Sequence, residues 1–195
     1  MLKSRINCYY AKHDCQRISQ GDILRDFTFI IIGKGGNQLE LKFPYIVILS
    51  QDCDLEHGSK LVPLQAASPE TEPIEFNQYL HNVLFSPAFT TESIKSGQHL
   101  KDLFNITTKP IASDLMKPIK QNENPRYHKL ISDLELQIPE LIIDFKAYYT
   151  VQFNLFYESY KDHYLATTNE LFRENLSQRF AFYLNRVGLP VIATA

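Results

Sequence analysis

The chain has 195 residues, of which 44% are hydrophobic, with 20 basic and 22 acidic side chains and a formal net charge of −2. A chain of this length and composition can bury one substantial core, so we expect a single domain over residues 1–195. The nearly balanced charge excludes a global attraction to nucleic acid or anionic lipid, and any such contact must be local.

The start of the chain and its cysteines indicate the compartment. Lys3 and Arg5 are not followed by an apolar run, and no stretch elsewhere approaches the length of a membrane-spanning helix. Cys8, Cys15 and Cys53 are odd in number and irregularly spaced, which argues against a secreted disulfide framework. We therefore expect a cytoplasmic protein with no membrane partner.

Dense runs of β-branched and aromatic residues predict two strands, over 22–32 and 43–50. The glycine-rich segment 33–37 between them suits a hairpin loop that needs positive φ. Pro44 must open its strand or lie on an edge, because it donates no ladder hydrogen bond. Residues 61–67 form a third candidate strand.

The middle of the chain shows weaker periodicity. A polar break over 68–75 precedes helical spacing of apolar residues over 74–85. Residues 105–125 hold three prolines and no sustained period, which predicts an exposed loop. Alternation over 149–157 then predicts a half-buried strand, whose expected partner is 141–147.

The chain ends in a predicted helix. Leu176, Phe180, Leu184 and Val187 form an apolar stripe at helical spacing. Thr167 and Glu170 fit a capping box before it, and Gly188 and Pro190 follow it. We expect C-terminal strands and a helix over 126–195, joined with the first strands in a single interrupted sheet.

Residues 19–68 carry a family resemblance. Gly21, Asp22, an apolar strand, a loose hairpin and a Pro44-led buried strand ending in Ser50 resemble the start of the MazF/PemK-like toxins. The resemblance implies an α+β fold, namely a MazF/PemK-like SH3-like β-barrel with helical insertions and a C-terminal strand-helix extension. The stretches 50–54 and 176–190 also resemble a set of uncharacterised bacterial proteins.

In that family an arginine before the proline, and a threonine or serine after the next strand, serve RNA cleavage by attack of the ribose hydroxyl. Phe43 stands in the arginine position here, and Ser68 matches the second position. An uncharged aromatic cannot stabilise the charged phosphorane, and loss of such a donor costs about a hundredfold or more in rate. Arg25, on the preceding strand, is the available substitute.

The resemblance therefore implies a non-catalytic interaction or regulatory protein of a bacterial toxin–antitoxin or phage-defence system. One MazF-like relative in a CRISPR-linked signalling system sequesters a sigma factor, so we expect an antitoxin-like or sigma-factor-like protein partner. RNA is the alternative partner. The alternative function is a metal-independent, sequence-specific endoribonuclease in which Arg25 and Ser68 are catalytic.

A polar segment directly after the buried strand contains candidate binding residues, because strand ends that feed polar loops often carry sites. Its members are Gln51, Asp52, Cys53, Asp54 and His57. Cys53 and His57 are soft metal ligands, and Cys8, His13 and Cys15 would complete a zinc site with them. However, no two cysteines are two to four residues apart, so we expect neither a metal nor a cofactor. The alternative is a turn in which Asp52 and Asp54 bind backbone amides.

Two further charge patterns have functional interpretations. Asp26, followed by Glu40 and Lys42 on the next strand, resembles the arrangement of metal-dependent nucleases, although strand alternation alone places Glu40 and Lys42 together on a solvated face. Arg179 and Arg186 are seven residues apart on one helical face, where they would steer a protein or RNA partner or simply maintain solubility.

Overall fold

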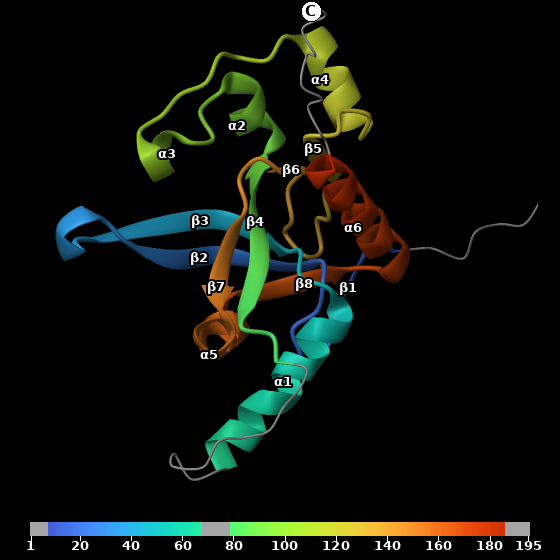
Figure 1. Cartoon of the computed structure of the whole chain (residues 1–195). Coiled ribbons are helices and arrows are strands. Elements are labelled where there is room, and N and C mark those ends of the chain that lie inside the picture. Colours follow the sequence, from blue (N-terminus) through green and yellow to red (C-terminus); the bar gives the residue numbers. More distant parts are fainter. Residues whose placement is uncertain (1–7, 68–78, 186–195) are drawn as a thin grey trace, which may run out of the picture.

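The computed structural model describes residues 8–67 and 79–185, and its fold is α+β (Figure 1). Eight strands form one curled antiparallel sheet, as the prediction of a single interrupted sheet required. The neighbouring strands are, in order, β1 (Tyr10–Ala11), β8 (Tyr164–Thr168), β2 (Asp22–Ile32), β3 (Gln38–Ile48), β4 (Asn82–Thr90), β6 (Leu141–Asp144) and β5 (Tyr127–Leu130), and β7 (Tyr149–Gln152) also pairs with β4.

Six α-helices occur in the described residues and cover both faces of the sheet. They are α1 (Asp52–Ala67), α2 (Thr91–Ser96), α3 (Lys101–Phe104), α4 (Ser113–Lys120), α5 (Phe153–His163) and α6 (Glu170–Leu184). Ile46 and Ile48 of β3 face a core that receives side chains from all helices except α6, whereas Val47 faces a second core closed by α6. The last three residues of β3, Ile46, Val47 and Ile48, are all apolar because the strand is buried on both faces there.

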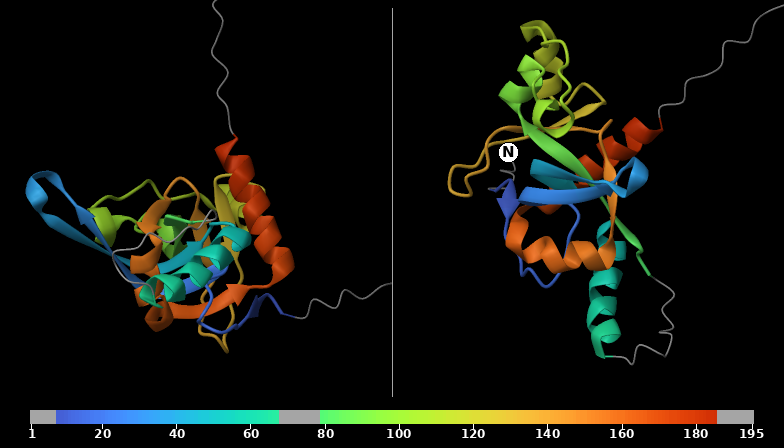
Figure 2. Two further views of the ribbon diagram at one scale, coloured as in Figure 1. Left: turned by 60° about the horizontal axis from the view of Figure 1, so that its bottom comes forward. Right: turned by 90° about the vertical axis from the view of Figure 1, so that its left-hand side faces the viewer.

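The predicted hairpin is confirmed, and it is longer than expected. β2 covers residues 22–32 as predicted, while β3 begins at Gln38 rather than at residue 43, and the short 3-10 helix η1 (Lys34–Gly36) joins them. β8 pairs only with residues 22–24 of β2, and β4 pairs only with residues 45–48 of β3. The rest of the hairpin projects as a two-stranded ribbon (Figures 1 and 2). Pro44 lies where β3 loses its second neighbour, so its predicted edge position is confirmed.

The prediction of a strand over 61–67 is wrong, as is that of a turn over the residues after Ser50, because both segments belong to α1. Asp52 and Asp54 occupy the first turn of this helix, where acids interact favourably with the helix dipole. Gly58 lets the helix approach α5, since a Cβ there would lie 2.5 Å from the Phe153 ring.

Two predictions about the middle of the chain need correction. Residues 82–85 of the predicted helix form the start of β4, with Val83 and Phe85 in the core, and residues 68–78 lie outside the described part. The loop predicted over 105–125 is exposed over 105–110, but Ser113–Lys120 is a helix that buries Met116 and Ile119. Pro118 lies within that helix and does not end it.

The predicted pairing of 141–147 with 149–157 is wrong. β6 and β7 lie one after the other along the same edge of β4, and Ser86 Oγ donates a 2.7 Å hydrogen bond to the carbonyl of Ala147 in the turn between them. Residues 153–157 belong to α5. The last helix is confirmed over 176–184, although its cap is Asn169 rather than Thr167, and residues 186–195 lie outside the described part.

Candidate functional site

The segment before β2, which contains Gly21, and the segment after β3, which contains Ser50 and Asp52, lie next to each other in the fold. The backbone amide of Gln20 donates to Asp52 Oδ1 at 3.0 Å, and its side-chain amide donates to the carbonyl of Leu49 at 2.9 Å. The segment before β2 is thereby joined to the segment after β3. The polar residues gathered at this junction form what we call the Asp22–Asp52 cluster, which comprises His13, Arg17, Asp22, Asp52, Tyr160 and Arg173.

Gly21 makes the close approach of β2 and β8 possible. Its φ is +81°, in the region that favours glycine, and a Cβ at this position would lie 2.1 Å from Thr168 Oγ1. Its amide donates to the carbonyl of Ile48, and its carbonyl accepts from the amide of Thr168. The glycine of the motif is therefore a structural requirement of the junction.

Asp22 is a fully buried carboxylate with three hydrogen-bond donors. Its Oδ2 accepts from the backbone amide of Ser19 at 2.6 Å and from the Tyr160 hydroxyl at 2.7 Å, and its Oδ1 lies 2.9 Å from His13 Nε2. Burying a charge is costly unless it is paired and hydrogen-bonded, and these donors meet that requirement. Asp22 thus joins the N-terminal segment, β2 and α5 at one point.

Both ring nitrogens of His13 are engaged. Nδ1 lies 2.8 Å from the carbonyl oxygen of Asp14, and Nε2 faces the Asp22 carboxylate. Because a carbonyl and a carboxylate only accept hydrogen bonds, the ring fits this position as an imidazolium that donates twice. The hydrogen bond to Asp22 raises the pKa of His13, against desolvation, which lowers it. No ring nitrogen is left to act as a general base.

Two arginines share the carboxylate of Asp52 at the mouth of the junction. Arg17 Nη2 lies 2.7 Å and Arg173 Nη1 3.4 Å from Asp52 Oδ2. They line a cavity of about 500 Å³ with Asp52 and His13. The hydroxyls of Thr167 and Thr168, which are buried beside this cavity, make no hydrogen bond within the described residues. The cavity is polar and offers cationic donors, but it holds no aligned nucleophile and base.

The predicted binding segment does not converge on this cavity as a whole. Asp52 belongs to the cluster, whereas Gln51, Cys53 and Asp54 are exposed around the first turn of α1 and His57 is half-buried one turn further on. Arg17, Tyr160 and Arg173 were missed by sequence reasoning. The sequence signals of the cluster were Gly21 and Asp22 at the start of the first strand, Asp52 after the second, and His13 near the start of the chain.

The metal-site alternatives gain no support from the geometry. Cys8, Cys15 and Cys53 are free thiols, and His13 is bound to Asp22. Over residues 8–67 and 79–185, no group of three or more histidine, cysteine or acidic side chains is placed to hold a metal ion.

The positions that correspond to catalytic residues by resemblance are occupied differently. Phe43 is fully buried, with its ring centroid 6.0 Å from that of Phe85 and 5.2 Å from that of Tyr149. Arg25 is half-buried, and its Nε lies 3.8 Å from Asp26 Oδ2 on the adjacent residue. Ser68 lies outside the described residues.

Asp26, Glu40 and Lys42 are all exposed on the hairpin. Lys42 Nζ lies 3.6 Å from Glu40 Oε1, so the predicted solvated face with both residues is confirmed. Asp26 and Lys42 line a cavity of about 400 Å³ beside Pro44, together with His99, which lies between α2 and α3. Burial lowers the pKa of His99, which therefore favours its neutral form.

Arg179 is turned inward and bound within the protein, which does not favour the prediction that it steers a partner. Its guanidinium donates to the backbone carbonyls of Asn122, Asn124 and Tyr127, and it fastens α6 to the turn before β5. Burial lowers the pKa of this arginine. Arg186 lies outside the described residues.

Comparison with known proteins returned no match: no family model, no curated protein and no solved structure is similar to this chain. In the described part of the chain, no helix combines the length and apolar character that crossing a bilayer needs.

His13 predicts a pH-dependent contribution to stability. The pKa of His13 is raised above its ordinary value of 6.5 in the folded protein. Protonated His13 therefore stabilises the fold fully at pH values below 6.5, and this stabilisation is lost as the pH rises through the raised pKa. In urea unfolding, we expect the difference in unfolding free energy between wild type and His13→Gln to shrink over that range. His81→Gln, at an exposed position, is the control. A difference that does not change with pH would contradict the imidazolium assignment.

Removal of the Arg179 guanidinium is expected to reduce stability strongly. Arg179→Met keeps an unbranched apolar stem but leaves the three carbonyls without their donor, so we expect a loss of about 1–3 kcal/mol in unfolding free energy. Lys161→Met, at an exposed position of α5, should change it by less than about 0.5 kcal/mol. Equal stability of the two variants in urea unfolding would show that Arg179 is not a structural residue.

Proposed function

We propose that this protein is a non-catalytic interaction or regulatory module of a bacterial toxin–antitoxin or phage-defence system, built on a divergent MazF-like barrel. It acts by binding a protein partner that is antitoxin-like or sigma-factor-like. The observation that carries the proposal is the position of Phe43, which stands where the resembled family has an arginine.

The burial of Phe43 supports this function for a physical reason. Its ring packs with Phe85 and Tyr149 in the core, so an arginine could occupy the site only by burying an unpaired guanidinium. The polar junction at Asp22 offers no free base, because both nitrogens of His13 are already hydrogen-bonded, and its arginines Arg17 and Arg173 are paired with Asp52. The geometry favours a fold retained for binding over one retained for RNA cleavage.

The projecting part of the hairpin, residues 28–41, supplies a surface for a partner. We call this part the arm. Both of its outer edges lack a neighbouring strand among the described residues, so their backbone groups are available to an added strand. Ile30, Ile32 and Leu39 are 56%, 74% and 51% exposed, so the arm presents apolar side chains next to its open edges. Addition of an extended partner segment to this edge would pair its backbone and cover the isoleucines.

The second candidate function is a metal-independent endoribonuclease, and one observation favours it. The cavity beside Pro44 is lined by both neutral His99 and Lys42, and a base and a cation are two of the groups that ribose-hydroxyl attack requires. A metal-dependent nuclease acting through Asp26 at the same cavity is a weaker candidate.

Incubation with a long single-stranded RNA distinguishes these functions. We expect no cleavage above the background rate in EDTA or in magnesium, because no cation occupies the position of Phe43. Cuts in EDTA at a short fixed sequence would overturn the proposal, and their loss in His99→Gln, Arg25→Ala or Ser68→Ala would identify the catalytic group. Cuts that need both magnesium and Asp26 would establish the metal-dependent alternative.

The arm predicts a selective loss of partner binding. When the tagged protein is recovered from its native cells, we expect a protein partner to be retained by wild type and by Leu134→Lys, whose site is 93% exposed on another loop. Ile32→Lys should lose that partner, because the added charge must be desolvated when a strand covers the edge. Equal retention by both variants would exclude the arm as the binding surface.

A further inference from the structure

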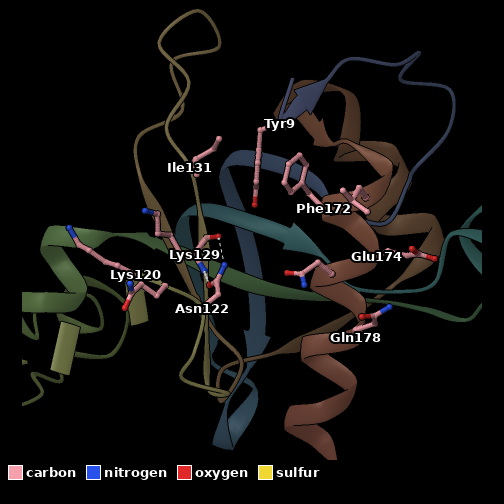
Figure 3. Close-up of a pocket in the computed structure, with 11 residues that line it drawn as sticks. Tyr9, Lys120, Asn122, Lys129, Ile131, Phe172, Glu174 and Gln178 are labelled. Carbon is pink, nitrogen blue, oxygen red and sulfur yellow. Dashed lines mark hydrogen bonds between the residues drawn. The ribbon is translucent and has the colours of Figure 1, made fainter. Parts of the chain in front are cut away.

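A third cavity, of about 520 Å³, lies between α6 and the segment that carries β5 (Figure 3). It is separate from the Asp22–Asp52 cluster and from the arm. Its volume is within the range of small-molecule sites, which extends from about 300 to 1,000 Å³. Its walls differ in chemistry from one end to the other, which restricts the class of ligand.

One end of the cavity is aromatic and apolar. The rings of Tyr9 and Phe172 lie 4.1 Å apart between centroids and are tilted by 33°, with Ile131 beside them. Figure 3 shows these three side chains together at one end of the cavity. Tyr9 and Phe172 are only half-buried, so part of the aromatic surface faces the cavity. Such a surface accepts the face of a planar ring, because stacking is favourable for any base.

The other end is cationic and held in place. Lys120 Nζ and Lys129 Nζ lie 3.4 Å and 3.0 Å from the two oxygens of the Glu140 carboxylate, which also accepts from Thr91 Oγ1 at 2.8 Å. Two ammonium groups share one carboxylate, so a net positive charge and several N–H donors remain. In Figure 3 the carboxylate of Glu174 lies on the side of α6 away from the two lysines.

Amide side chains line the region between these ends, and one of them is fixed. Asn122 Oδ1 accepts from the backbone amide of Lys129 at 2.6 Å, and the backbone carbonyl of Asn122 is held by Arg179. Gln121, Asn175 and Gln178 line the same cavity, and amides carry both donors and acceptors. They can hydrogen-bond the edge of a heterocycle whose face lies against the aromatic end.

We propose that this cavity binds a nucleotide, with the base on Tyr9 and Phe172 and the phosphate at Lys120 and Lys129. A planar heterocycle joined to an anion would use both ends, whereas an apolar ligand would make no use of the lysine N–H donors and inorganic phosphate would leave the aromatic end unused. The same chemistry is offered by a free nucleoside monophosphate and by the phosphorylated 5′ end of an RNA. The inference is independent of the proposed partner binding.

Calorimetric titration of the full chain tests the site. The probes are the four ribonucleoside 5′-monophosphates, their nucleosides and inorganic phosphate. We expect at least one monophosphate to bind about tenfold more tightly than its nucleoside or phosphate alone. Lys120→Gln and Phe172→Leu should each weaken that binding about tenfold, while Lys161→Gln and Phe182→Leu, at exposed positions, should not change it.

The source of the ligand is resolved with 5′-phosphorylated and 5′-hydroxyl oligonucleotides. Preferential binding of the phosphorylated oligonucleotide identifies an RNA end, and binding of monophosphates alone identifies a free nucleotide. Amide chemical shifts of the wild-type protein provide a readout that needs no variant, because the changes must fall around Asn122, Lys129 and Phe172. The proposal is overturned if no monophosphate gives saturable binding, if phosphate alone binds as tightly, or if the shift changes lie elsewhere.

Discussion

The buried carboxylate of Asp22 is the interaction on which the rest of the structure depends. A charge without solvent contact must find its donors inside the protein, and these come from His13, Ser19 and Tyr160. Two of the donors lie in the segment before β2, and the third is separated from Asp22 by 138 residues of sequence. The N-terminal segment and α5 are therefore fixed to the first residue of β2, next to the close contact of Gly21 with β8.

β2 is held at its first residues, 22–24, by pairing with β8, and its other end projects from the sheet as part of the hairpin (Figure 1). The hairpin is supported by the ring contacts of Phe27 and Phe43 with Phe85, and both residues lie just outside the parts of β2 and β3 that pair with β8 and β4. In the proposed function, Phe43 thus has a role of its own: it anchors the base of the arm that receives the partner. The charged groups at the Asp22 junction hold elements of the fold together, and in the proposed function the partner binds on the arm.

The sequence predicted the elements whose patterns are unambiguous and missed those in which two periods coincide. The strand 22–32 has continuous β-branched and aromatic residues, so its bounds were predicted correctly. Phe153 and Tyr157 fit strand alternation, but with Phe156 and Tyr160 they also fit helical spacing, and burial of the latter pair on α5 decided the outcome. Because of Pro118, the sequence predicted a loop where α4 lies. The acidic residues at the start of α1 are also common in turns, so the sequence predicted a turn there.

The sequence identified only some residues of the candidate sites, because the others reach those sites through tertiary packing. Gly21, Asp22 and Asp52 lie in short motifs next to strands, and a local reading found them. Tyr160 and Arg173 reach the cluster through tertiary packing, and no local pattern marks them. The inward position of Arg179 was equally hidden, because a helical face says nothing about which carbonyls a neighbouring turn presents.

The protonation state of His13 shows directly whether the Asp22 junction is structural. A structural imidazolium carries a proton on both ring nitrogens, whereas a catalytic base leaves one of them unprotonated. Nitrogen-15 NMR of the histidine side chains at pH 6.5, the ordinary pKa of the group, reads the number of protons on each ring. We expect His13 to be mostly protonated on both nitrogens, and His13→Gln to remove the corresponding signals. A neutral ring with one unprotonated nitrogen at this pH would contradict this expectation.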